Sequence, residues 1–474
     1  MADLNFPFPT QLFIDGKLVD GHSSTRHTLH NPFDNSVICT DVQYATAEDA
    51  DLAVAAATTA FTAGSWRSFT GAQRGQALLK LADLMLANSE ELCWLEGLPI
   101  GKPMPIAKWE LQIGVDILKY YAGWADKYAG ESYPADDGYI KIVRQEPLGV
   151  VAGILPWNGP IAIMCLKLGP ALATGNTLIL KPSEKTPFGA VRIAELATSA
   201  GILPPGVLQV LPGAGATGDL LARHMDVRKI SFTGSVTTGR LVQKAATDSN
   251  LKRVTLELGG KSPAIIFDDC NLENAIQWAT MAITANTGQA CYAASRVFVQ
   301  EGIKDRFVEG YVAAMKKAGE GLPPLADQKQ FERVSGFFER DAGKTEVLVG
   351  GARFGEKGWF WEPTVLWEPE RDAEVYKEEI FGPVSVVKVF KEEEEVVKWA
   401  NETEYGLMAG VFTQDINRAM RVSAALESGV VGVNCVSYVN VQAPFGGAKQ
   451  SGLGREMGHY ALRAYTEPKT VLIK

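Results

Sequence analysis

The sequence lacks the residue clusters that mark metal-binding and nucleic-acid-binding proteins. It has five histidines and six cysteines in 474 residues, and no two cysteines form a CxxC pair. Neither a metal site nor disulfides are therefore expected. Lysine and arginine form no basic run, and the formal net charge is -9. Nucleic acid is excluded as a partner because phosphate binding needs a clustered basic surface.

Signals for export and for membrane insertion are also missing. Residues 1–5 provide neither the basic start nor the apolar core of a signal peptide. Two uncharged stretches, 147–166 and 274–295, approach membrane-spanning length. Prolines interrupt the first stretch and polar side chains interrupt the second. We therefore expect a cytoplasmic protein with no membrane partner.

Apolar residues are abundant enough for a folded protein with more than one core. Hydrophobic residues make up 46% of the chain and charged residues 21%, which is ordinary for a globular enzyme. A chain of 474 residues exceeds the length that one hydrophobic core usually serves. Two or more domains are expected.

Strand-like and helix-like segments alternate through the middle of the chain. Apolar strands are predicted over 149–154, 177–181, 207–211 and 229–233, with helices over 161–173 and 188–200. Strands that are apolar on both faces and separated by helices indicate a parallel, doubly wound sheet. The pattern restarts at 262–267. The predicted fold class is therefore α/β, with two doubly wound parallel-sheet domains.

Three short segments carry the groups needed to oxidise an aldehyde through a thioester. Cys291 follows a glycine-containing loop, Glu257 opens the sequence Glu-Leu-Gly-Gly-Lys, and Asn158 follows Leu-Pro-Trp. A thiolate adds to a carbonyl carbon, an amide N–H stabilises the oxyanion, and a carboxylate activates water. Cys93, Cys165 and Cys435 lie in apolar surroundings and fit structural burial better. Asp268 and Asp269 disfavour a thiolate at Cys270.

Two glycine-containing turns compete as the phosphate-binding site of a dinucleotide. Residues 213–218, which include Gly215, match GxGxxG but lack the expected acid about 20 residues later. They are interpreted as either a tight turn or an adenine-side wall. The better phosphate site is Gly234, Ser235 and Thr238, where a strand ends and a helix begins. Lys181 and Glu184 suit a ribose, and the carboxylate favours NAD over NADP by repelling a 2′-phosphate.

The three segments around Asn158, Glu257 and Cys291 resemble the signature regions of the NAD(P)-dependent aldehyde dehydrogenase superfamily, and the likeness covers about residues 12–474. The resemblance implies a cysteine nucleophile, an Asn158 oxyanion donor and Glu257 as the base. It also implies that Lys167 orients Glu257 or Asn158. Further cofactor residues implied by the resemblance are Ile154, Trp157, Leu258, Glu379 and Phe381.

The resemblance also suggests a division of the chain. An NAD-binding domain is expected over 1–124 and 148–256 and a catalytic domain over 257–446. Residues 125–147 and 447–474 are expected to form a small bridging β element used in subunit assembly. A homodimer or homotetramer is the implied assembly.

The presence of Glu257 favours hydrolysis of the thioester by water over transfer to coenzyme A. By resemblance, an apolar aldehyde tunnel is lined by Gly159, Met164, Tyr292, Val439 and Phe445, and Gly159 suggests a wider entrance. An apolar aliphatic or aromatic aldehyde is the expected substrate.

Two alternatives remain open at this point. If the chain is not an oxidising enzyme, it is either a catalytically silent structural or binding homologue or a cofactor-independent cysteine esterase.

Overall fold

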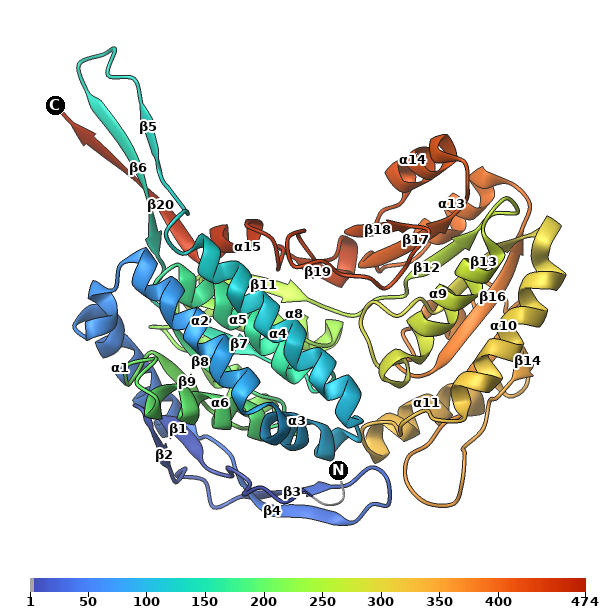
Figure 1. The fold of residues 1–474 in the computed structure, drawn as a ribbon, viewed down its shortest axis with the longest axis horizontal. Helices are drawn as coiled ribbons and strands as arrows, with labels where there is room; N and C mark the ends of the chain where they lie inside the picture. Colours follow the sequence, from blue (N-terminus) through green and yellow to red (C-terminus); the bar gives the residue numbers. More distant parts are fainter. Residues whose placement is uncertain (1–3) are drawn as a thin grey trace.

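Two large sheets, one in each lobe of the molecule, form the centre of the fold (Figure 1). The structure is a computed structural model and describes residues 4–474. Each sheet consists mainly of parallel strands with helices on both faces. The predicted α/β fold with two parallel-sheet domains is confirmed. Within residues 4–474, no helix combines the length and apolar character needed to cross a bilayer.

The first sheet has eight strands, and its central five are parallel. In spatial order its strands are β19 (Gly452–Leu453), β11 (Arg253–Glu257), β10 (Lys229–Thr233), β7 (Val150–Ile154), β8 (Thr177–Lys181), β9 (Leu208–Val210), β1 (Leu12–Ile14) and β2 (Lys17–Val19). The β1–β2 hairpin turns at Asp15 and Gly16, where both φ angles are positive. Glycine adopts this conformation without strain, which explains the Asp-Gly pair.

Helices cover both faces of the first sheet. They are α1 (Ala47–Thr62), α2 (Gly71–Ala87), α3 (Ser89–Gly97), α4 (Met104–Trp124), α5 (Pro160–Ala173), α6 (Phe188–Ser199), α7 (Gly215–Arg223) and α8 (Val236–Asp248), with short 3₁₀ turns at Ser65–Ser68 and Leu98–Ile100. Leu178 and Leu180 of β8 pack with α2, α4 and α5, whereas Ile179 packs with α1 and α7. Successive side chains of a strand point to opposite faces, so a doubly covered strand must be apolar throughout.

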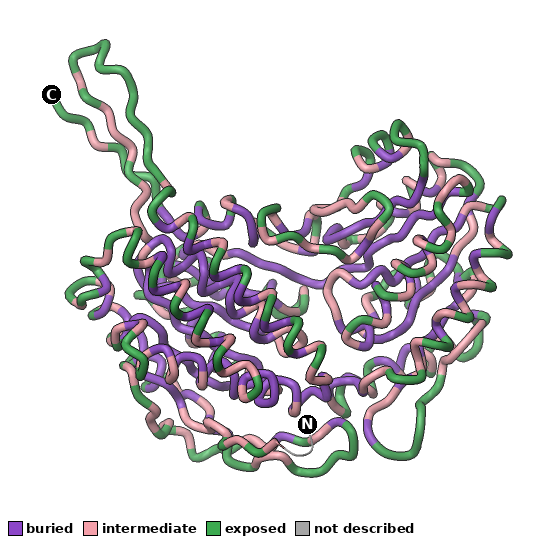
Figure 2. Tube along the Cα trace, viewed as in Figure 1, coloured by how far each residue is buried: buried purple, intermediate pink, exposed green. Residues whose placement is uncertain are grey.

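The second sheet has seven strands and the same construction. In spatial order they are β14 (Glu346–Val349), β15 (Thr364–Trp367), β16 (Val384–Phe390), β13 (Arg296–Gln300), β12 (Pro263–Ile266), β17 (Met408–Phe412) and β18 (Val430–Val433). Its helices are α9 (Leu272–Thr284), α10 (Lys304–Gly319), α11 (Gln328–Asp341), α12 (Glu374–Lys377), α13 (Glu393–Asn401) and α14 (Ile416–Ala425), with 3₁₀ turns at Ala285–Gly288 and Glu301–Ile303. The central strands of both sheets are buried, whereas edge strands such as β2 and β14 are partly exposed (Figure 2).

A third, antiparallel sheet projects from the first lobe as an arm (Figure 1). It consists of β5 (Glu131–Tyr133), β6 (Ile140–Pro147) and β20 (Thr466–Ile473), and β20 pairs with β6 from Thr466 to Ile473. The two segments expected to form a β element, 125–147 and 447–474, therefore both contribute strands to this sheet. The segment 447–474 contributes to two sheets, because β19 pairs with β11 in the first lobe. A 3₁₀ turn (Lys449–Ser451) and α15 (Tyr460–Arg463) complete this segment.

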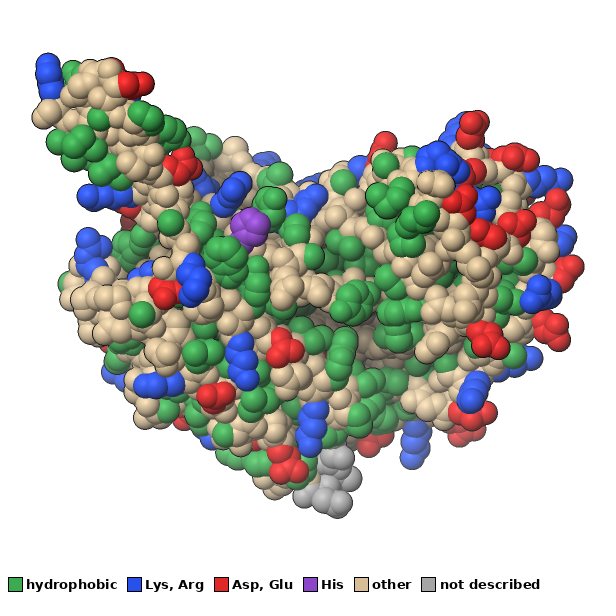
Figure 3. All heavy atoms as spheres, turned by 45° about the horizontal axis from the view of Figure 1, so that its top comes forward, with side chains coloured by type: hydrophobic (Ala, Val, Ile, Leu, Met, Phe, Trp, Pro, Cys, Tyr) green, Lys and Arg blue, Asp and Glu red, His purple; other side chains and the backbone are tan. Residues whose placement is uncertain are grey.

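A small hairpin, β3 (Arg26–His30) and β4 (Val37–Gln43), lies beside the first lobe. Between the two lobes the surface is hollowed, and hydrophobic side chains gather around the hollow (Figure 3).

Asn176 joins the first sheet to the base of the arm. Its side chain is fully buried, accepts a hydrogen bond from the Gly149 N–H at 2.9 Å and donates to the Tyr465 carbonyl at 2.9 Å. Its own carbonyl accepts from the Trp66 indole at 3.1 Å. The amide side chain therefore satisfies backbone groups that have no water to bond.

Replacing Asn176 with alanine leaves the Gly149 N–H and the Tyr465 carbonyl buried without these partners. We expect Asn176→Ala to lower the free energy of unfolding by about 3 kcal/mol. Urea unfolding followed by circular dichroism measures the change. The exposed Gln328→Ala is the matched control, with an expected change under about 0.5 kcal/mol. A change below about 1 kcal/mol at Asn176 contradicts the role assigned to it.

Candidate active site

The loop that carries Cys291 is strained and held by hydrogen bonds. Asn286, Thr287 and Gly288 have φ angles of 49°, 57° and 69°. The first two are outside the region that side chains favour, and a Cβ at Gly288 would clash with the Gly382 carbonyl. The Gln289 side chain accepts from the Ala326 N–H at 2.9 Å. The loop therefore presents Cys291 at a fixed position just before β13.

Asn158 contacts the same loop from the first lobe. Its side-chain amide donates to the Gln289 carbonyl at 3.0 Å, which leaves the second N–H of the amide for another acceptor. Its backbone carbonyl accepts from the Asn286 amide at 3.1 Å. Asn158 follows β7, so the carboxyl edge of the first sheet meets the amino edge of the second sheet here.

Glu257 is the last residue of β11 and is almost fully buried. Burial raises its pKa to about 8, and Glu456 adds to the rise, while a hydrogen bond from the Cys291 thiol opposes it. Its Oε1 has no hydrogen-bond partner within residues 4–474 and is available to a water molecule. A carboxyl group with this pKa suits proton removal near neutral pH.

Burial also raises the pKa of the Cys291 thiol, and the neighbouring Glu257 contributes to the rise. A charged Glu257 therefore opposes ionisation of the Cys291 thiol. Protonation of Glu257 removes that repulsion and favours the thiolate.

Asn158, Glu257 and Cys291 lie where two cavities meet, as the sequence predicts. One cavity, of about 230 Å³, is also lined by Trp157, Gly234, Ser235, Glu379 and Phe381. The other, of about 120 Å³, is lined mostly by apolar side chains. A reactive thiol thus faces two different chambers.

The 230 Å³ cavity continues into a third cavity of about 680 Å³, because Trp157, Gly234 and Ser235 line both of them. Of the predicted cofactor residues, this third cavity is lined by Ile154, Trp157, Lys181, Glu184, Gly215, Gly234, Ser235 and Thr238. The glycine-rich turn at 213–218 therefore forms a wall of this cavity.

Ser235 begins the helix α8, and its side chain accepts from the Thr238 N–H. The other N–H groups of the first turn have no partner within the helix and suit a diphosphate. Lys181 donates to the Gly213 carbonyl, and its Nζ lies 4.0 Å from the Glu184 carboxylate. Burial lowers the pKa of Lys181 to about 8. These polar groups fit a dinucleotide laid across the carboxyl edge of the first sheet.

Glu379 and Phe381 reach the 230 Å³ cavity from the second lobe. Glu379 accepts a hydrogen bond from the Gly260 N–H at 2.9 Å, and burial raises its pKa to about 7. The ring of Phe381 meets Trp157 edge to face at 5.5 Å between centroids. Both lobes therefore contribute to one cofactor-sized cleft.

Three residues do not lie where the resemblance implies. Lys167 donates to Thr233 at 2.7 Å and pairs with Glu456, so it contacts neither Glu257 nor Asn158. Leu258 points into the buried cluster beneath α8 and lines none of the three cavities.

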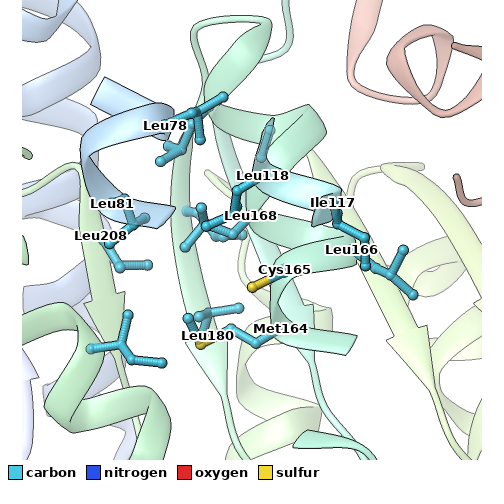
Figure 4. Packing of buried hydrophobic residues seen from close by; sticks show 14 of the residues in the cluster. Leu78, Leu81, Ile117, Leu118, Met164, Cys165, Leu166, Leu168, Leu180 and Leu208 are labelled. Carbon is cyan, nitrogen blue, oxygen red and sulfur yellow. The ribbon is translucent and has the colours of Figure 1, made fainter. Parts of the chain in front are cut away.

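Met164 is the third. Gly159, Tyr292, Val439 and Phe445 line the 120 Å³ cavity, but Met164 is 1% exposed and packs in the core beside Leu180 (Figure 4). On α5 the lining positions are Ala162, Ile163 and Leu166, and helical geometry turns position 164 to the opposite, sheet-facing side. At Gly159, Ile163 Cδ1 lies 3.3 Å from where a Cβ would stand, so the Ile163 side chain borders the space that the missing side chain leaves.

The lining or supporting residues that were not predicted include four charged side chains and one amide: Lys102, Glu110, Gln330, Arg333 and Glu456. Gln330 and Arg333 belong to α11, whose sequence carries no motif, and only the fold brings them to the cofactor cavity. Glu456 has one local signal, the glycine-rich stretch 452–454 that precedes it.

Comparisons with known proteins agree with this geometry. The family model described as the aldehyde dehydrogenase family matches residues 18–471. An aldehyde dehydrogenase of Agaricus bisporus is 45% identical over 98% of this chain and 94% of its own length. The structure of an aldehyde dehydrogenase from Bacillus cereus in complex with NAD+ is 42% identical, with a TM-score of 0.94 over 98% of this chain and 96% of that one. An indole-3-acetaldehyde dehydrogenase from P. syringae, also in complex with NAD+, is 38% identical, with a TM-score of 0.96 over 99% and 97%. The resemblance seen in the sequence is confirmed, and the chain belongs to the aldehyde dehydrogenase family.

Proposed function

We propose that this protein oxidises an aldehyde to a carboxylic acid with NAD, through a thioester on Cys291 that water hydrolyses. The observation that carries the proposal is the position of Cys291, Glu257 and Asn158 at the junction of a cofactor-sized cleft and an apolar chamber. A second arrangement, a Cys–His esterase, is not favoured, because no histidine is among the described residues that line either chamber.

The first chemical step is attack of the Cys291 sulfur on the aldehyde carbon. The oxyanion that forms is held by the free side-chain N–H of Asn158 and by the backbone N–H of Cys291. Donors that are already oriented stabilise this charge without reorganisation at the moment of reaction. The Gln289 carbonyl keeps the Asn158 amide in place for this task.

NAD is the implied cofactor and supplies the hydride acceptor when bound. The diphosphate is assigned to Gly234, Ser235 and Thr238, the adenosine ribose to Lys181 and Glu184, and the nicotinamide side to Trp157, Glu379 and Phe381. Gln330 and Arg333 belong to the same nicotinamide-side wall. The carboxylate of Glu184 disfavours a 2′-phosphate, so NADP is the poorer cofactor.

Glu257 completes the turnover. Once the sulfur is acylated it carries no negative charge, so Glu257 loses its proton more readily. The carboxylate then removes a proton from water, which attacks the thioester and releases the acid. Coenzyme A is not needed as the acceptor.

The substrate is assigned to the apolar chamber. Ile106, Ile113, Ile163, Tyr292 and Phe445 line it, which suits an apolar aliphatic or aromatic aldehyde. No arginine of residues 4–474 lines this chamber, so an acidic semialdehyde has no guanidinium partner there.

We further propose a homodimer or homotetramer in the cytoplasm. The arm supports an assembly role, because β20 and β5 are both edge strands of a sheet that stands away from the body (Figure 2). Unpaired strand edges are usually covered by a neighbouring chain or element. The separate sheets of the two lobes and the arm support a division into domains. We propose an NAD-binding domain over 1–124 and 148–256, a catalytic domain over 257–446, and bridging segments over 125–147 and 447–474.

Removing the sulfur tests the nucleophile. We expect Cys291→Ala to reduce NADH formation by at least about 10³-fold, because no thioester can form. NAD binding, followed by quenching of tryptophan fluorescence, stays within about twofold, since the cofactor contacts are unchanged. Cys435→Ala, a partly exposed cysteine elsewhere, serves as the control and keeps its activity. Turnover by Cys291→Ala would refute the assignment.

Neutralising Glu257 tests the base. We expect Glu257→Gln to retain a burst of NADH but to lose about 100-fold in steady turnover, because acylation proceeds and hydrolysis stalls. In the wild type the pKa of about 8 means that the carboxyl is protonated below pH 7. The steady rate should therefore rise with pH through about 8 and level off above about pH 9. A rate that is flat from pH 6 to 8 contradicts this role.

Removing the Glu184 carboxylate tests cofactor choice. We expect Glu184→Ala to lower the ratio of kcat/KM for NAD over NADP by about tenfold, because a charge facing the 2′ position is lost. Steady-state kinetics with both cofactors give the ratio. Glu90→Ala, an exposed carboxylate on α3, should leave it unchanged. An unaltered ratio in Glu184→Ala means that another group sets the preference.

A further inference from the structure

A buried ion pair lies directly behind Asn158. Lys102 stands between the 3₁₀ turn at Leu98–Ile100 and α4, and Glu110 lies on α4. The side chains are 3% and 11% exposed, and Lys102 Nζ contacts Glu110 Oε2. Lys102 Nζ also donates to the Asn158 backbone carbonyl at 2.9 Å. A charged pair in the protein interior needs such extra partners to offset the loss of water.

The second oxygen of Glu110 is committed to the start of α5. Glu110 Oε1 accepts hydrogen bonds from the Ile161 N–H at 3.1 Å and the Ala162 N–H at 3.4 Å. These N–H groups belong to the first turn of the helix and have no partner within it. The positive end of α5 and the Lys102 ammonium therefore hold the two oxygens of one carboxylate. The pair has a defined place relative to both α4 and α5.

Asn158 is consequently held from several directions. Its carbonyl accepts from Lys102 Nζ and from the Asn286 amide, and its side-chain amide donates to the Gln289 carbonyl. The peptide that carries Asn158 precedes Gly159, which has no side chain to restrict its backbone. Because the local sequence does not restrict the backbone here, the contacts to the Asn158 carbonyl hold the amide at one position.

We propose that Lys102 and Glu110 are a positioning pair that fixes the oxyanion donor Asn158. The inference rests on the proposed role of Asn158 in the reaction. The pair acts through the backbone carbonyl of Asn158, and loss of the Lys102 ammonium releases the amide from its orientation. A displaced donor stabilises less of the developing charge, so acylation slows while binding of NAD is unaffected.

The test compares the rate of the NADH burst in the wild type and three variants, with hexanal and NAD as reactants. Lys102→Met keeps an apolar stem of similar length and removes the ammonium. We expect it to slow the burst by about 10- to 100-fold, which is no more than the effect of removing one oxyanion donor. The KM for NAD should stay within about twofold of the wild-type value. Lys102→Arg restores a cation and should recover part of the rate. Lys108→Met replaces an exposed lysine on α4, is the matched control and should match the wild type.

A double-mutant cycle separates positioning from a merely structural role. Asn158→Ala should slow the burst, and adding Lys102→Met should slow it by no more than a further twofold or so, because the pathway through Asn158 is already lost. Additive effects would overturn the proposal. A Lys102→Met enzyme with a lower unfolding midpoint but an unchanged burst rate would also overturn it.

Glu110→Gln provides a second variant should Lys102→Met not fold, since the amide oxygen still accepts from α5. It is expected to slow the burst in the same sense, and a normal burst would count against the pair. Failure of the wild type to form any NADH from NAD with hexanal or other apolar aldehydes would instead overturn the proposed function, and with it this inference.

Discussion

The hydrogen bond from Asn158 to the Gln289 carbonyl joins the carboxyl edge of the first sheet to the amino edge of the second. The first lobe brings Asn158 and Glu257 at the ends of parallel strands. The second brings Cys291 and Glu379 on the loops that enter its own parallel strands. Neither lobe holds a complete set of reacting groups. The site exists only where these two edges meet, and the strained loop before Cys291 is tolerated because contacts from both lobes hold it.

Burial and charge divide the work between the thiol and the carboxyl. Burial raises the pKa of Cys291 and the pKa of Glu257. The charge of Glu257 opposes ionisation of the thiol, whereas the hydrogen bond from the thiol favours ionisation of Glu257. Only one of the two is readily charged at a time, which suits a reaction in which sulfur attacks first and the carboxylate acts afterwards. The buried partners Lys167 and Glu456 lie behind this pair and shape the field around Glu257.

Much of the fold and the reacting groups could be predicted from the sequence for physical reasons. Doubly covered strands are mostly apolar on both faces, so β7 and residues 178–180 of β8 stand out as uninterrupted apolar runs. Because parallel strands end at the same edge, Ile154, Lys181 and Glu257 could be expected near one another. The face of a helix on which a given side chain lies was harder to predict from the sequence. Met164 differs from Ile163 by one position, yet it faces the core. Gln330 and Arg333 reach the site through packing between the lobes, and Lys102 reaches it through packing within the first lobe. Neither kind of packing leaves a local sequence pattern.

The central claim is that Cys291 becomes acylated during turnover. Glu257→Gln enzyme mixed with NAD and hexanal, quenched in acid and digested, can be read by peptide mass spectrometry. The account predicts a hexanoyl mass increase on the peptide that contains Cys291, dependent on NAD, and none on peptides that contain the other five cysteines. A burst of NADH with no acyl group on that peptide would contradict it.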